Sequence, residues 1–385
     1  MPVQITIDGR SGIFDQGVSL FDAAERLGRR PHSSCGKNGR CRECLLEVRG
    51  GNGLLTPKTA AEAHLSGDFR LSCRAQLAGA DGAVVLKSPS RGVMRILDAG
   101  EGLPQTAAST PLDPAVVRAG RRILLEGTEV AAGTGAVYGA AADVGTTTVV
   151  VRIYDLETKA LVAGTAFENP QRFAGSDVMA RIAFDTRYGG RLLQRVLINS
   201  MTRALKELPI DTTCIYEMVV VGNSTMRDLF FGLDVEAIGQ KPYRSLTETA
   251  VREGRAASTG VATTAAKLRL PFHPAARICG LPLIGSHVGA DAAACLLALD
   301  MDRRPDLVAL MDIGTNTEVA CGNRDQLFVA SCPAGPAFEG GAIQCGMPGW
   351  DGAIERVKLN GGDRPEFSVI GGGEPEGLCG SGLVD

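Results

Sequence analysis

The feature that most restricts how this chain can fold is a loop with three cysteines in ten residues. "CGKNGRCRECLLEV" contains Cys35, Cys41 and Cys44, and Cys73 follows in "LSCRAQ". Such spacing indicates metal or redox chemistry, because a chain of 385 residues does not need disulfides to stabilise its core. The start lacks the basic and apolar regions of a secretory leader, so a cytoplasmic protein is expected. The seven remaining cysteines are scattered, and we interpret them as small buried hydrophobic residues.

The four cysteines follow the spacing C-x5-C-x2-C, with 28 further residues before the last one. Plant-type ferredoxins use C-x4-C-x2-C and a distant fourth cysteine, so this loop resembles that of related ferredoxins with one extra residue. Gly36 and Gly39 allow the sharp turn that presents three thiolates to two irons. A structural zinc site is the alternative, but zinc ligands usually come as two close pairs, whereas these are grouped three plus one. We therefore predict a 2Fe-2S cluster held by Cys35, Cys41, Cys44 and Cys73.

Residues 1–90 are predicted to form a small α+β domain around the cysteine loop. "VQITI" alternates apolar and polar residues as a half-buried strand does, and "CLLEVRG" and "GAVVLKS" are predicted as further strands. "SLFDAAERLG" is predicted as a helix that Ser19 caps and Gly28 ends. This order of elements is typical of a β-grasp ferredoxin, with the cysteine loop between the helix and a strand.

A change of pattern separates this domain from the rest of the chain. Residues 91–137 are predicted to be a linker, because "EGLPQTAASTPLDP" is rich in Pro, Thr and Ala and lacks periodicity. One short helix is expected in "PAVVRAGRRILL". From Tyr138, apolar strands alternate with segments of helical spacing, which predicts an α/β domain over residues 138–385.

A short motif occurs twice in the α/β part. "DVGTTT" begins at Asp143 and "DIGTNT" at Asp312, roughly 170 residues later. Glycine in such a turn lets the backbone approach a phosphate, to which threonine hydroxyls and amides donate hydrogen bonds. The aspartates suit a hydrated Mg2+ ion, which prefers carboxylate ligands. The repeat therefore predicts two similar lobes facing a nucleotide, the first at about 138–285 and the second at about 286–385.

With these turns the chain resembles the ASKHA superfamily of sugar kinases, actin and heat-shock chaperones, which are ATPases of actin-like fold. "SHVGADAAAC" is similar to its first connecting helix, and "GEPEGLCGSGLVD" to its adenosine loop. The resemblance implies ATP and Mg2+ as ligands, with catalytic roles for Asp143, Asp291 and Asp312. A helix-start carboxylate is the alternative for Asp291, and a surface acid for Glu339. The implied nucleotide-binding residues are Gly145, Thr146, Thr147, Gly314, Thr315, Asn316, Glu339, Gly377, Gly380 and Gly382, of which the last three have a plain turn as the alternative.

The sequence stops at Asp385, where a helix is expected to close the adenosine loop. We therefore expect an incomplete second lobe and a C-terminally truncated chain. The expected fold is a β-grasp ferredoxin domain followed by a two-lobed, actin-like ATPase domain.

A 2Fe-2S domain joined to this ATPase fold resembles the reductive activators of corrinoid-dependent enzymes. The resemblance is carried by "NPQRFAGSDVMARI", "VVGNSTMRDLFFGLD" and "CPAGPAFEGGAIQCGMPGWDGAIERV". It implies an ATP-dependent iron–sulfur reductase that returns one electron to an inactive Co(II) corrinoid protein and restores Co(I) in a methyltransferase system. The implied partners are that corrinoid protein and an upstream low-potential electron donor, and a homodimer is a candidate assembly. The alternative is a ferredoxin-type electron carrier whose second half only binds nucleotide or docks.

Several other classes of function are disfavoured. A net charge of −3 and a pI near 5.9 give no sign of a nucleic-acid binder. No uninterrupted apolar run approaches the length of a membrane span. An activase for a radical dehydratase shares the ATPase fold but usually holds a 4Fe-4S cluster between two subunits, which "CGKNGRCREC" argues against. A small-molecule kinase needs no cluster.

Overall fold

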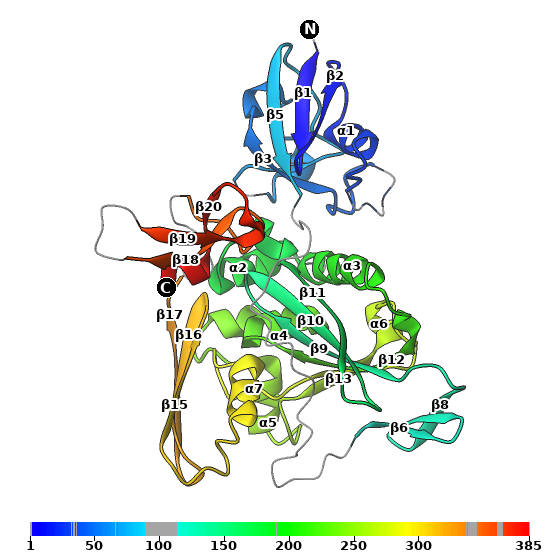
Figure 1. Ribbon diagram of the computed structural model, residues 1–385, viewed down its shortest axis with the longest axis vertical. Helices are drawn as coiled ribbons and strands as arrows, with labels where there is room; N and C mark the ends of the chain where they lie inside the picture. Colours follow the sequence, from blue (N-terminus) through cyan, green and yellow to red (C-terminus); the bar gives the residue numbers. More distant parts are fainter. Residues whose placement is uncertain are drawn as a thin grey trace.

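The structure is a computed structural model that describes residues 2–31, 33, 35, 37–65, 67–88, 114–189, 191–335, 337, 345–359 and 365–384. The strands in these ranges form five separate sheets. Figure 1 shows the N-terminal sheet at one end of the molecule, standing on a larger α/β body. None of the helices in the described ranges combines the length and the hydropathy that crossing a bilayer requires.

The N-terminal domain is a five-stranded mixed sheet that curls around one helix, as in a β-grasp fold. Its elements are β1 (Val3–Ile7), β2 (Arg10–Phe14), α1 (Leu20–Arg26), β3 (Leu45–Gly50), η1 (Asn52–Leu54), η2 (Ala60–Glu62), β4 (Phe69–Leu71) and β5 (Gly82–Lys87). The strand order is β2-β1-β5-β3-β4, with β1 parallel to β5 and the other neighbours antiparallel. Ser19 caps α1, as predicted, by accepting a hydrogen bond from the Asp22 amide at 3.1 Å.

Residues 116–132 form a small antiparallel sheet where the sequence predicted a linker with one short helix. Its strands are β6 (Val116–Ala119), β7 (Arg122–Leu125) and β8 (Thr128–Ala132). The helix expected in "PAVVRAGRRILL" is therefore wrong: Gly120 has a φ of +63° and reverses the chain between two strands. Val116 and Ile123 pack with Val137 and Tyr216 in a small core of their own. Residues 89–113, which include the rest of the predicted linker, lie outside the described ranges.

The first lobe is built on a six-stranded sheet. Its elements are β9 (Tyr138–Val144), β10 (Thr148–Asp155), β11 (Leu161–Glu168), η3 (Pro170–Ala174), α2 (Val178–Tyr188), α3 (Leu192–Lys206), η4 (Thr212–Cys214), β12 (Ile215–Val221), α4 (Ser224–Phe231), η5 (Glu236–Gly239), α5 (Leu246–Arg252), β13 (Val261–Thr264), α6 (Ala265–Leu268), β14 (Arg277–Gly280) and α7 (Ala290–Ala298). The strand order is β11-β10-β9-β12-β14-β13. The central strand β9 is antiparallel to β10 and parallel to β12, and its C-terminal end carries the first motif.

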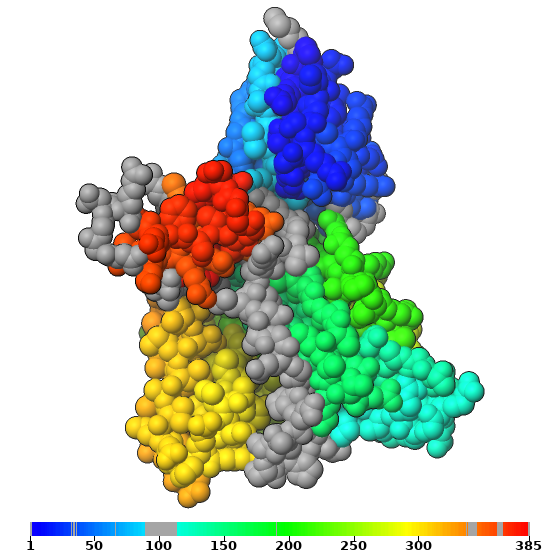
Figure 2. Space-filling model, viewed as in Figure 1, coloured from blue at the N-terminus to red at the C-terminus, as the bar shows by residue number. Residues whose placement is uncertain are grey.

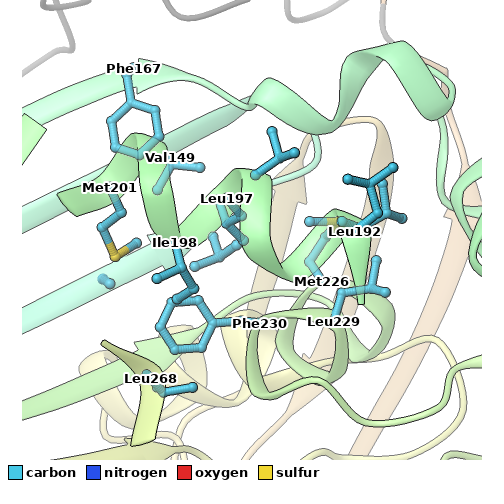
Figure 3. Packing of buried hydrophobic residues seen from close by; sticks show 14 of the residues in the cluster. Val149, Phe167, Leu192, Leu197, Ile198, Met201, Met226, Leu229, Phe230 and Leu268 are labelled. Carbon is cyan, nitrogen blue, oxygen red and sulfur yellow. The ribbon is translucent and has the colours of Figure 1, made fainter. Parts of the chain in front are cut away.

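Helices α3 and α4 cover this sheet with apolar side chains. The buried residues of α3 recur at helical spacing and so lie on one face: Leu192, Leu193, Val196, Leu197, Ile198, Met201 and Leu205. Figure 3 shows Leu197, Ile198 and Met201 gathered with Val149 and Phe230 around one apolar centre. Burying each large side chain of this kind stabilises the fold by about 1.5–3 kcal/mol.

The C-terminal part consists of two three-stranded sheets. The elements are β15 (Val308–Ile313), β16 (Asn316–Gly322), β17 (Leu327–Pro333), β18 (Ala353–Lys358), β19 (Glu366–Val369), η7 (Ile370–Gly372), β20 (Gly377–Leu378) and α8 (Gly380–Val384). The first sheet is an antiparallel meander, and the second has the order β19-β18-β20. In the view of Figure 2, the second sheet (red) lies between the N-terminal domain (blue) and the β15–β17 sheet (yellow and orange).

The N-terminal domain packs directly on the first lobe, and the two share one apolar core. Leu45, Leu65 and Phe69 of the N-terminal domain belong to the same buried cluster as Phe173 and Phe184 of the lobe. The cysteine loop therefore lies at a boundary between two folded parts, with one side turned towards the lobe.

His64 lies in this boundary and is buried. Its ring stands edge-on to those of Phe184 and Tyr188 in α2, with centroid distances of 6.3 and 6.0 Å. Its Nε2 atom is buried without a hydrogen-bond partner. Burial lowers the pKa of this imidazole from 6.5 to about 4, helped by the positive charges of Arg42 and Lys58. Glu62 and a backbone hydrogen bond at Ala61 oppose that shift.

The His64 shift predicts that the domain boundary weakens in mild acid. The unfolded chain binds this proton with a pKa of 6.5, and the folded chain binds it with a pKa of about 4. Protonation therefore favours the unfolded chain, so the contribution of neutral His64 to the stability of the fold is complete above pH 6.5 and is lost as the pH falls towards 4. Between about pH 7.5 and 5 we expect a loss of about 2 kcal/mol in the free energy of unfolding, measured with urea. His64→Phe should remove this part of the pH dependence. If His64→Phe loses as much stability over this pH range as the unsubstituted chain does, the prediction is wrong.

Candidate functional site

The four predicted cluster ligands form two pairs, one brought together by strand pairing and one within the loop. Leu45 lies opposite Leu71 in the β3–β4 ladder, which places Cys44 and Cys73 side by side with their Sγ atoms 3.3 Å apart. Cys35 and Cys41 flank Ser33, whose Oγ lies 3.9 Å from each of their Sγ atoms. Cys41, Cys44 and Cys73 are buried and Cys35 is half-buried. Gly39 has a φ of +79° in the turn between them, and Gly36 lies outside the described residues.

The surroundings of these thiols favour the thiolate at two of them. Burial opposes ionisation of Cys35, but hydrogen bonds from the Cys41 and Asn38 amides and the Cys41 and Ser33 side chains outweigh it and lower its pKa to about 6. The hydrogen bond shared by Cys44 and Cys73 lowers the pKa of Cys44 to about 7 and raises that of Cys73. The thiolate is the form that binds metal. Two pairs of thiols on one loop and two strand ends are a donor set that fits a 2Fe-2S cluster, in which four cysteines serve two irons.

The two repeated motifs have the same local structure and meet in space. Each is a turn between antiparallel strands, β9–β10 for the first and β15–β16 for the second. Thr147 Oγ1 lies 3.4 Å from Thr315 Oγ1, although the residues are 168 positions apart. Position 145 requires glycine, because the backbone is packed so closely there that a Cβ would lie 2.6 Å from the Thr148 carbonyl oxygen. Gly314 shares the second turn with Thr315, and Asn316 begins β16.

Asn169 and Arg181 hold the first turn from the core side. The Asn169 side chain donates to the Gly145 carbonyl at 2.8 Å, and its backbone amide donates to the Thr147 carbonyl at 2.6 Å. Arg181, which is fully buried in α2, donates to the Thr146 carbonyl at 2.6 Å. With these carbonyls bound to the core, the turn offers amide and hydroxyl donors to a ligand, which suits an anionic phosphate. Sequence reasoning missed both roles, although both residues lie in the family-like stretch "NPQRFAGSDVMARI".

Asn169→Ala is predicted to destabilise the fold by about 1–3 kcal/mol, because it removes a fully buried side chain and leaves the partly buried Gly145 carbonyl without its donor. It also removes the cap of η3, where the Asn169 side chain accepts from the Gln171 amide. The measurement is the free energy of unfolding in urea. Asn323→Ala is the matched control, since Asn323 caps an exposed turn, and should cost about 1 kcal/mol or less. Equal losses in the two variants would contradict the prediction.

Asn223 links the same turn to the helix that carries Asp291. It caps α4 by accepting from the Met226 amide at 2.9 Å, and its Nδ2 donates to Thr146 Oγ1 at 3.1 Å. The Ala290 amide at the start of α7 donates to the Gly222 carbonyl at 3.0 Å. Asn223 therefore both caps a helix and contacts the turn, two roles that the sequence analysis did not assign. Asp177 likewise caps α2, accepting from Ala180 at 2.8 Å.

Carboxylates from the two motifs and from α7 share one electrostatic environment. Burial is the main cause that raises the pKa of the Cys295 thiol in α7 to about 11. Negative charges add to this shift, in decreasing order those of Asp312, Asp291, Asp143 and Glu318. Among the described residues, no three His, Cys, Asp or Glu side chains converge as a ready-made ion site. The donor chemistry of this acidic group, Asp143, Asp291, Asp312 and Glu318, fits a hydrated Mg2+ ion.

Burial disfavours ionisation of three of these carboxyl groups, those of Asp291, Asp312 and Glu318. It raises the pKa of Asp291 to about 6, with a further contribution from Asp312, and it also raises the pKa of Asp312. It raises the pKa of Glu318 to about 7, opposed by a hydrogen bond from Ser331 Oγ at 2.8 Å. A bound cation would reverse these shifts. Sequence reasoning missed Glu318. Its position opposite Asp312 in the β15–β16 hairpin is the feature that could have identified it.

The remaining predicted residues belong to the last strand and helix of the chain or fall outside the described ranges. Gly377 begins β20, and Gly380 and Gly382 lie in α8. A Cβ on Gly377 or Gly382 would lie 2.5 or 2.4 Å from a backbone oxygen, so both allow tight packing. Their nucleotide role stays a prediction. Glu339 lies outside the described residues.

Three family models match consecutive parts of this chain. Residues 5–78 match the 2Fe-2S iron-sulfur cluster binding domain, residues 138–304 match the RACo middle region, and residues 306–385 match the C-terminal domain of RACo, the ASKHA domain. The solved structure of a reductive activator for corrinoid, iron-sulfur protein has a TM-score of 0.62 at 23% identity, covering 100% of this chain and 71% of that one. That likeness concerns the fold.

Two relatives are similar over more than half of this chain. The corrinoid activation enzyme RamQ of Eubacterium limosum is 38% identical over 256 residues, which are 65% of this chain and 41% of RamQ. The Co(II) methylated amine-specific corrinoid protein reductase of Methanosarcina barkeri is 29% identical over 236 residues, 58% of this chain and 41% of that protein. The aligned region thus spans about two fifths of the length of each of these relatives.

Proposed function

This chain belongs to the RACo family of reductive activators of corrinoid-dependent enzymes, and we propose on that premise that it is an ATP-dependent reductase of a corrinoid protein. The reaction returns one electron to an inactive Co(II) corrinoid protein and restores Co(I). The observation that carries the proposal is the packing of two thiol pairs against a lobe whose phosphate turn faces a second such turn. When bound, a 2Fe-2S cluster supplies single electrons.

The energetic reason for ATP is the low potential of the Co(II)/Co(I) couple. Plant-type clusters lie near about −400 mV, and each 100 mV of uphill transfer costs roughly 2.3 kcal/mol per electron. Nucleotide binding offsets such a cost only if it changes which state of the complex is favoured. We propose that closure of the two turns on Mg-ATP changes how the chain docks on its corrinoid partner.

The residues of the paired turns have distinct roles in this proposal. The amides and hydroxyls of Gly145, Thr146 and Thr147 donate to the phosphates from one side, and those of Gly314, Thr315 and Asn316 from the other. Asp143 and Asp312 would hold a hydrated Mg2+ ion, and Asp291 and Glu318 would add negative charge to the same environment. Asn169 and Arg181 keep the first turn in its binding conformation.

The partners follow from the same chemistry. We propose a corrinoid protein of a methyltransferase system as the electron acceptor, and a low-potential carrier as the donor. The names of the two relatives support a corrinoid partner. None of the eleven cysteines, all of which lie in the described ranges, forms a disulfide, which suits the reducing cytoplasm.

The decisive experiment follows cobalt directly. The reduced holoprotein is mixed with a Co(II) corrinoid protein, and the Co(I) absorption band is recorded with and without Mg-ATP. We expect the band to appear with Mg-ATP and to be largely absent without it. Equal formation without nucleotide would favour the alternative, a ferredoxin-type electron carrier with a module that only docks.

A further inference from the structure

The one-turn helix η3 connects the first phosphate turn with the N-terminal domain. Its cap, Asn169, is fully buried and donates to the Gly145 carbonyl at 2.8 Å. Three residues later, Arg172 Nη2 lies 3.0 Å from Glu47 Oε1 in β3. β3 begins directly after Cys44. The segment formed by η3 and its cap thus contacts the first motif at one end. At the other end it contacts β3, the strand that follows Cys44.

The interior of η3 is tightly held. Gln171 is fully buried, donates to the Leu193 carbonyl at 3.1 Å and accepts from Arg181 at 3.3 Å. Phe173 is also fully buried and packs edge-on against Phe184, with ring centroids 5.4 Å apart. Because close-packed interiors transmit strain, a displacement at one end of this segment is passed to the other.

The ion pair at the far end is partly shielded from solvent. The side chains of Arg172 and Glu47 are 30% and 14% exposed. Arg172 is oriented by a second carboxylate, because its Nη1 donates to Glu168 at the end of β11, and Glu168 is buried. Water and salt screen such a pair less than one on the open surface.

We propose that Arg172 and Glu47 are positioning residues that couple the first phosphate turn to the N-terminal domain through η3. The inference rests on the proposed function, since it takes the turn at Gly145 as the nucleotide-phosphate site. A nucleotide that draws this turn inward moves Asn169 and, through η3, the strand that follows Cys44. Coupling between sites is reciprocal, so loosening β3 also loosens the turn.

The test perturbs β3 and observes the distant turn. In the full-length holoprotein without nucleotide, Glu47→Gln should accelerate amide hydrogen exchange in peptides covering residues 143–149 by about fivefold, the lower end of ordinary coupling between sites. Glu43→Gln is the matched control, because Glu43 lies 3.6 Å from Arg195 of α3, across the same boundary, so its ion pair involves a different element from η3. It should change this exchange by less than about twofold. Iron content and urea unfolding of both variants verify that each is folded and loaded.

The exchange result decides the inference on its own. Unchanged exchange in Glu47→Gln, or equal acceleration in both variants, would overturn it. A second measurement is the dissociation constant for Mg-ATP. This constant should rise about fivefold in Glu47→Gln and stay constant in Glu43→Gln. If the unsubstituted chain does not bind Mg-ATP, the proposed function fails, while the exchange comparison still decides whether η3 couples the turn to β3.

Discussion

Replacing Cys41 with serine should abolish cluster binding in an otherwise folded chain, and corrinoid reduction with it. Cys41 is buried beside Cys35 and shares Ser33 with it, so no other thiol is placed to take over its position among the described residues. A serine oxygen is a harder and poorer ligand for an iron–sulfur cluster than a thiolate. We expect cluster content to fall by about a hundredfold or more, since even changes around metal ligands cost about 10–100-fold. The measurements are iron, acid-labile sulfide and visible absorption.

Cys214→Ser is the matched control for this experiment. Cys214 ends η4 and packs beside the small core of Val137 and Tyr216, away from the cysteine loop. This variant should retain its full complement of iron and sulfide. Retention of both by Cys41→Ser would refute the assignment of the loop, and so would stoichiometric zinc in place of iron in the unsubstituted chain.

Asp312→Asn should reduce the Mg-ATP-dependent rate of Co(I) formation by about 10²–10³-fold, the usual cost of losing one electrostatic contact in a water-poor site. Asp312 lies in β15 directly before the second turn, and burial raises its pKa, so a bound cation is its natural counter-charge. Asparagine preserves the shape but removes the charge. The rate of appearance of the Co(I) band at saturating Mg-ATP is the measurement, with iron content checked in parallel.

The control for the charge itself is Asp325→Asn. Asp325 lies in the exposed turn between β16 and β17, where its side chain is 75% exposed. Its removal changes the net charge by the same amount and should leave the rate unchanged. If Asp312→Asn keeps the rate of the unsubstituted chain, the second motif does not take part in nucleotide chemistry.

Local patterns predicted most of the fold. The N-terminal domain was predictable because its strands alternate and its helix has a cap at Ser19, and both signals are local. The 116–132 sheet was missed because its strands are four or five residues long and its reversals depend on Gly120 and Gly127 adopting positive φ. Such short strands show too little periodicity to be distinguished from a helix.

The candidate site was predictable where the spacing of one residue type or a repeated motif indicates its chemistry. Cysteine spacing predicted the four thiols, and the repeat predicted two turns that the structure brings together at Thr147 and Thr315. Asn169 and Arg181 could not be assigned from sequence, because each acts through a contact that only the tertiary fold creates. Glu318 required the register of the β15–β16 hairpin, which places it opposite Asp312. The ligand roles themselves await the experiments above.

The burial of the thiols has a consequence for biosynthesis. Cys44 and Cys73 belong to the apolar core that the N-terminal domain shares with the first lobe. Iron and sulfide have easier access to these thiols before that core forms than afterwards. Maturation of the holoprotein is therefore expected to follow an order, in which the inorganic atoms are inserted first and the two folded parts close afterwards.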